Sequence, residues 1–80
     1  MESVWLFEME DIVRVFSTRE KAIQHLKEKE IPHWMKGNGE IAHEEHSDDW
    51  SLFTVRFPAW EEMNLKGFSV GVYIGRYAVE

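Results

Sequence analysis

The residues whose types and spacing could do chemistry gather between residues 37 and 55. This segment contains no lysine or arginine and five carboxylates, which are Glu40, Glu44, Glu45, Asp48 and Asp49. A run of one charge around Trp50 is typical of a surface that meets a basic partner, because opposite charges speed the encounter. The alternative is a solvated edge hairpin whose charges discourage aggregation between sheet edges.

Two histidines in the same segment, His43 and His46, suggest a metal site. Residues three apart share one face of a helix, but this stretch lacks the apolar stripe of a helix. On a strand the two side chains would point to opposite sides, so they could chelate a metal only from a loop. A metal-binding sensor or enzyme at this pair is therefore the last of three hypotheses, and we expect no metal and no cofactor.

Motifs for catalysis are missing from the sequence. The chain has no cysteine and no Gly-x-Ser-x-Gly elbow, which removes the usual thiol and serine nucleophiles. The triplet Gly37-Asn38-Gly39 lacks the Lys-Ser/Thr ending of a phosphate loop, and the adjacent Glu61-Glu62 pair would not converge on one substrate atom. We therefore expect no catalytic residues and no enzyme.

Bulk composition narrows the class of protein. Eighty residues predict one domain over residues 1–80, and a formal net charge of −6 argues against a nucleic-acid binder. The apolar run at residues 4–7 is too short for a signal peptide or a membrane span. Without cysteine the chain suits a reducing compartment, so we expect a cytoplasmic protein with no membrane contact.

One amphipathic helix should organise the fold. Ser17 is expected to cap its start, with Glu20 completing a capping box three residues later. Its apolar face is formed by Ala22, Ile23 and Leu26. Pro32 disfavours helical backbone at the residue before it, so the helix should end near Glu30.

Strand patterns surround this helix. Residues 3–9 and 12–16 alternate as a hairpin, and further strands are expected over 40–46, 50–57 and 68–79. For residues 59–66 a helical turn and an irregular loop fit equally well. The predicted fold is α+β in the order β-β-α-β-β-β, an antiparallel sheet with the helix packed on one face.

The last strand predicts a sheet with two apolar faces. On this strand the side chains of Val70 and Val72 are expected to point to one side of the sheet. Those of Tyr73 and Tyr77 are expected to point to the other, which we call the tyrosine side. We expect the tyrosine side to be joined by three residues of the preceding strand, which are Phe53, Val55 and Phe57. One short helix cannot cover both faces, so either a partner covers the second face or the sheet curls to cover itself.

The segment 12–26, IVRVFSTREKAIQHL, resembles the opening of small uncharacterised proteins common in bacteriophages and prophages. The matching residues are Val15, Phe16, Ser17, Thr18, Lys21 and Ala22, after a short strand and an acidic turn. The resemblance implies a mobile-element origin, in which compact acidic proteins often bind and disable a host protein. It brings no catalytic residue.

The leading hypothesis is a non-enzymatic protein-binding module, of the phage-inhibitor kind, for a protein with a basic surface. The residues expected to bind that partner are Glu44, Glu45, Asp48, Asp49, Trp50, Tyr73 and Tyr77. The second hypothesis is a self-associating module in which the aromatic face forms a homodimer.

Overall fold

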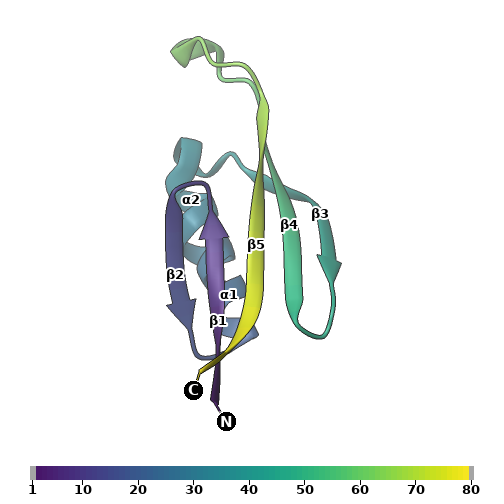
Figure 1. Cartoon of the computed structure of the whole chain (residues 1–80). Helices are drawn as coiled ribbons and strands as arrows, with labels where there is room; N and C mark the ends of the chain where they lie inside the picture. Colours follow the sequence, from purple (N-terminus) through teal and green to yellow (C-terminus); the bar gives the residue numbers. More distant parts are fainter. Residues whose placement is uncertain (1, 80) are drawn as a thin grey trace.

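The computed structural model describes residues 2–79, apart from the side chains of residues 35 and 36. Along the chain the elements are β1 Glu2–Met9, β2 Ile12–Phe16, α1 Arg19–His25, the π-helical turn η1 Leu26–Glu30, α2 Ile31–His33, the 3₁₀ turn η2 Trp34–Gly37, β3 Glu40–His46, β4 Trp50–Phe57, the 3₁₀ turn η3 Glu61–Met63 and β5 Phe68–Val79. The strands form one antiparallel sheet in the order β2-β1-β5-β4-β3. The helical run from α1 to α2 lies against one face of it (Figure 1). The predicted α+β fold is confirmed.

The helix begins one residue later than expected. Thr18, not Ser17, is the N-cap, and its side-chain oxygen accepts a hydrogen bond of 3.1 Å from the backbone N–H of Lys21. Ser17 instead accepts from the Lys21 side-chain amine. The predicted capping box with Glu20 is therefore wrong, because the third helical position after Thr18 is a lysine.

The helical run also continues past its predicted end. The Ile31 N–H donates to the Leu26 carbonyl five residues earlier, which widens the turn between α1 and α2. Pro32 then stands in the first turn of α2, where a missing N–H costs least. The run consequently reaches His33 instead of stopping at Glu30.

The core lies between the helical run and the face of the sheet that it covers, which we call the inner face. Its fully or almost fully buried apolar residues are Phe7, Met9, Ala22, Leu26, Phe53, Val55, Phe57, Val70, Val72 and Ile74. Both sheet and helix contribute to this cluster, so the expected apolar face of the helix does pack on the sheet.

The register corrects the predicted composition of the two faces. Residues directly opposite each other in an antiparallel pair share a face, and Phe53 is opposite Val72 while Val55 is opposite Val70. The three residues Phe53, Val55 and Phe57 therefore belong to the inner face, not to the tyrosine side. The alternation within each strand was predicted, but which sides of β4 and β5 coincide depends on their register.

The hairpin between β4 and β5 continues beyond the sheet as a projecting arm, which we define as residues 58–67 (Figure 1). Trp60 and Leu65 exchange backbone hydrogen bonds of 2.9 and 3.0 Å across it. The tip is the 3₁₀ turn η3, followed by Asn64 in the left-handed region with φ 54°. Of the two possibilities open for this segment, the short helical turn is the one adopted.

Candidate functional site

The face of the sheet away from the helix, which we call the outer face, is covered by no element among residues 2–79 (Figure 1). Its apolar side chains come from four strands and are Val4, Leu6, Val13, Val15, Trp50, Leu52, Tyr73, Tyr77 and Val79. Val13 and Val15 are 51% and 60% exposed, and Tyr77 is 48% exposed. Because β2 and β3 lie at opposite edges and do not pair, the sheet stays open instead of curling over this face.

Two glycines shape the centre of the outer face. A Cβ atom on Gly75 would lie 2.7 Å from a ring carbon of Tyr73, so the tyrosine ring lies across this glycine. Trp50 and Leu6 are opposite Gly75 on the neighbouring strands. A Cβ atom on Gly71 would meet nothing within 4 Å. The outer face is therefore filled by aromatic rings at Gly75 and open at Gly71.

Carboxylates border this apolar surface. Glu2 and Glu8 lie on the same side of β1 as Val4 and Leu6, one at each end of that pair, and both are exposed. On the far side, Glu45 is opposite Leu52 in the β3–β4 pair. Arg56 of β4 also points to the outer face, but its guanidinium is paired with the Glu40 carboxylate. The charge left unneutralised around the outer face is therefore negative.

The five carboxylates of the acidic segment do not form one surface. Glu45 lies on the outer face, where its side chain is 2.8 Å from His43. Glu44 is opposite Phe53 and so belongs to the inner side, with His46 3.0 Å away. Strand alternation separates these neighbours, and it divides the two histidines in the same way.

The turn between β3 and β4 holds the remaining acidic residues. The Asp49 carboxylate is paired with Arg76 of β5, and the Arg76 N–H donates to the Asp49 carbonyl over 2.8 Å. The Asp48 carbonyl accepts from the guanidinium of Arg19, at the start of α1. These contacts fasten the turn to β5 and to the helix.

Of the seven residues predicted to bind a partner, Trp50, Tyr73, Tyr77 and Glu45 share the outer face. Asp48 and Asp49 stand at its end in the turn, and Glu44 is on the opposite side. The structure thus brings together the aromatic residues and one carboxylate. The valines of β2 complete the same surface and were not expected to contribute, because the face of β2 is known only from its register with β1.

A hydrogen-bonded chain on the inner side was not foreseen from the sequence. The Ser51 hydroxyl is 2.8 Å from His46 Nδ1, and His46 Nε2 is 3.0 Å from the Glu44 carboxylate. Serine, histidine and carboxylate make up a hydrolase triad, yet here Ser51 is completely buried and no substrate could reach its hydroxyl. These hydrogen bonds instead give the buried Ser51 hydroxyl a partner. The five-residue spacing of Ser51 and His46 across a turn was its only signal.

The hydrogen bond from His46 also affects the ionisation of Glu44. Donation to the carboxylate favours its charged form and lowers the pKa of Glu44, while the charges of His46, Lys27 and His43 act in the same direction. The Glu44 side chain is largely exposed, so the lowered pKa affects only the ionisation of this carboxylate.

No group of three or more potential metal-ligating side chains occurs within the part of the chain that the structure describes. His43 and His46 each lie against a carboxylate two residues away and point to different sides of β3. Across residues 2–79, none of the helices is both long enough and apolar enough to cross a membrane.

Comparison with known proteins returns no relative. No family model, no curated protein and no solved structure matches the chain.

Proposed function

We propose that this protein is a non-enzymatic binding module whose outer face binds another protein. The observation that carries the proposal is the uncovered apolar surface built by four strands, from Val15 at one edge to Trp50 near the other. Soluble proteins rarely leave a large contiguous apolar surface exposed unless it is a binding surface. Tyr73 and Tyr77 supply aromatic rings, which are preferred anchors of protein interfaces.

The charge around the outer face favours a partner that is not a second copy. Glu2, Glu8 and Glu45 border the apolar centre, and two such faces pressed together would bring like charges close to one another. A partner with an apolar patch bordered by lysine or arginine would match this distribution. The resemblance of residues 12–26 to phage proteins supports a host protein as that partner, whose activity the module would block.

An affinity capture from host lysate tests the proposal. The wild-type chain should retain one dominant protein, and the Tyr73→Ser, Tyr77→Ser double variant should lose it by at least about tenfold, as expected when two anchor residues are removed. Lys27→Ser changes an exposed residue of the helical run and is the matched control that keeps binding. Equal capture by all three chains would refute the proposed surface.

Light scattering separates this proposal from self-association through the same face. If the outer face joins two copies, the tyrosine double variant will have half the mass of the wild-type species. If the outer face binds a different protein, the substitutions will leave the mass unchanged while removing the captured partner.

A further inference from the structure

The triplet Gly37-Asn38-Gly39 lies between the helical run and β3. Asn38 is exposed in a turn, and Gly39 follows it outside any helix or strand. Among the residues whose side chains the structure describes, none forms a hydrogen bond or an ion pair with the Asn38 side chain. Water therefore reaches the Asn38 amide, and no described side chain holds that amide in place.

An asparagine followed by glycine is chemically labile. Asparagine is one of the thermolabile residues of proteins, because the backbone nitrogen of the next residue can attack its side-chain carbonyl carbon and close a succinimide ring. A side chain on that next residue crowds the attack, and glycine has none. The nitrogen of Gly39 is therefore more open to the Asn38 side chain than the nitrogen of any larger residue would be.

We propose that Asn38 is a modification site at which water converts the side-chain amide to a carboxylate through a succinimide. Hydroxide takes the proton of the Gly39 N–H, and the nitrogen attacks Asn38 Cγ. The new N–C bond forms as the C–N bond of the side-chain amide breaks, and the leaving nitrogen takes a proton from water and departs as ammonia. A second water then opens the ring. Opening at Cγ leaves an aspartate, and opening at the backbone carbonyl leaves an isoaspartate, whose main chain runs through Cβ and Cγ.

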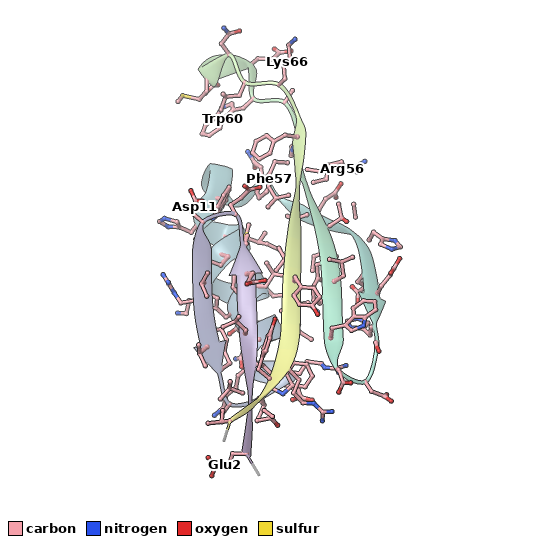
Figure 2. The ribbon with its side chains drawn as sticks, viewed as in Figure 1. Glu2, Asp11, Arg56, Phe57, Trp60 and Lys66 are labelled. Carbon is pink, nitrogen blue, oxygen red and sulfur yellow. The ribbon has the colours of Figure 1, made fainter. Side chains whose placement is uncertain are left out.

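The isoaspartate product would disturb the packing around this connection, because residues at both of its ends contact the same buried ring. Trp34 stacks on Phe57 with centroids 5.8 Å apart, and a Cβ atom on Gly39 would lie 2.5 Å from a carbon of that ring. Phe57 is fully buried, at the end of the sheet from which the arm projects (Figure 2). An isoaspartate adds one carbon to the main chain directly before Gly39, where the packing leaves no room for it.

The chain contains an internal control for the reaction. Its other asparagine, Asn64, is also exposed but is followed by Leu65, whose side chain crowds the attacking nitrogen. Trypsin separates the two sites into peptides 37–56 and 57–66, so mass spectrometry can follow both in one sample. During incubation of the full chain at mildly alkaline pH, Asn38 should exchange its amide for a carboxylate at least about tenfold faster than Asn64. Its rate should also rise with pH, because the Gly39 nitrogen must lose a proton. Equal rates at the two sites, or a rate at Asn38 that does not rise with pH, would overturn the proposal.

Two variants separate the effect of charge from that of the lengthened main chain. Asn38→Asp adds the same negative charge without an extra main-chain carbon, and because the side chain is exposed it should keep the Tm of the fresh wild type. The modified wild type can be isolated by ion exchange, and a methyltransferase specific for isoaspartate measures its isoaspartate content. This form should melt below Asn38→Asp, and an equal Tm would overturn the assigned effect on the Phe57 packing. Asn38→Gln needs a larger ring and should stay unmodified with an unchanged Tm through the same incubation. A loss of Tm in that variant as large as in the wild type would place the damage elsewhere.

Discussion

His25 and Glu30 form a paired contact that the π-helical turn makes possible. The two residues are five apart, and the wider turn brings His25 Nε2 within 2.9 Å of the Glu30 carboxylate. The imidazole also contacts the rings of Phe7 and Phe16, with centroids 5.2 and 5.1 Å away. A regular α-helix places residues three and four apart together, so the sequence alone did not indicate this pair.

Removal of the Glu30 carboxylate should therefore destabilise the fold. Glu30→Ala removes the hydrogen-bond partner of the partly buried His25 imidazole. We expect the free energy of unfolding to fall by about 1–3 kcal/mol. The matched change is Glu28→Ala, which breaks only an exposed hydrogen bond to Gln24 and should cost less than about 0.5 kcal/mol. Urea unfolding of both variants measures the difference. Equal losses would show that the His25 contact contributes nothing.

The ionisation of Glu44 provides a second test at a single residue. Its pKa should lie below the ordinary value of 4.5, because His46 donates a hydrogen bond to the carboxylate. A lowered folded-state pKa means that ionised Glu44 contributes stability above its unfolded pKa, and this contribution is lost as the pH falls through the folded value. Carbon-detected NMR titration measures the pKa. His46→Leu, which removes the donor, should raise the pKa of Glu44, and an unchanged value would contradict the assigned cause.

At the scale of elements, local sequence signals predicted which helices and strands exist better than they predicted the residues at which each begins and ends. The two hydroxyl residues Ser17 and Thr18 can each cap a helix, and the spacing to Glu20 favoured the wrong one. Pro32 was expected to end the helix, but a π-helical turn before it changes the hydrogen-bonding pattern. Such choices depend on how the whole run packs on the sheet, which a short window of sequence does not contain.

The connection into β3 depends on a glycine for reasons of space. A Cβ atom on Gly39 would lie 2.5 Å from a ring carbon of Phe57, which is fully buried. Gly39→Ala should therefore push the ring out of its stack and cost about 1–3 kcal/mol. Gly71→Ala is the control, because its Cβ meets open space and should stabilise the strand by up to about 1 kcal/mol. Thermal unfolding compares them, and a neutral Gly39→Ala would show that the ring can move freely.

For the whole molecule, the central expectation was that one helix leaves half of the sheet uncovered. That expectation is confirmed by the open sheet and the helical run on its inner face. The residues of the uncovered side were assigned only in part. Tyr73 and Tyr77 lie there as predicted, but Phe53 does not, because alternation defines two sides of each strand without saying which sides of neighbouring strands coincide. The spread of the acidic residues over both sides has the same cause.

The contrast between the two faces makes a prediction for one kind of substitution at two places. Valine and threonine have nearly the same shape, so Val→Thr mainly introduces a hydroxyl. At Val72, which is fully buried on the inner face, the hydroxyl loses its hydration, and we expect a cost of about 1–3 kcal/mol. At Val15, which is 60% exposed on the outer face, it stays in water, and the change should lie within about 0.5 kcal/mol.

Denaturant unfolding of the two valine variants should be measured on the isolated chain and again with the bound partner. A large cost at Val15 in the isolated chain would mean that something already covers the outer face. If Val15→Thr weakens binding while leaving the free chain intact, the apolar surface is retained for the partner and not for the fold. Stability and binding would then depend on opposite faces of one sheet, with β2 contributing to both through the alternation of Ile12 and Val13.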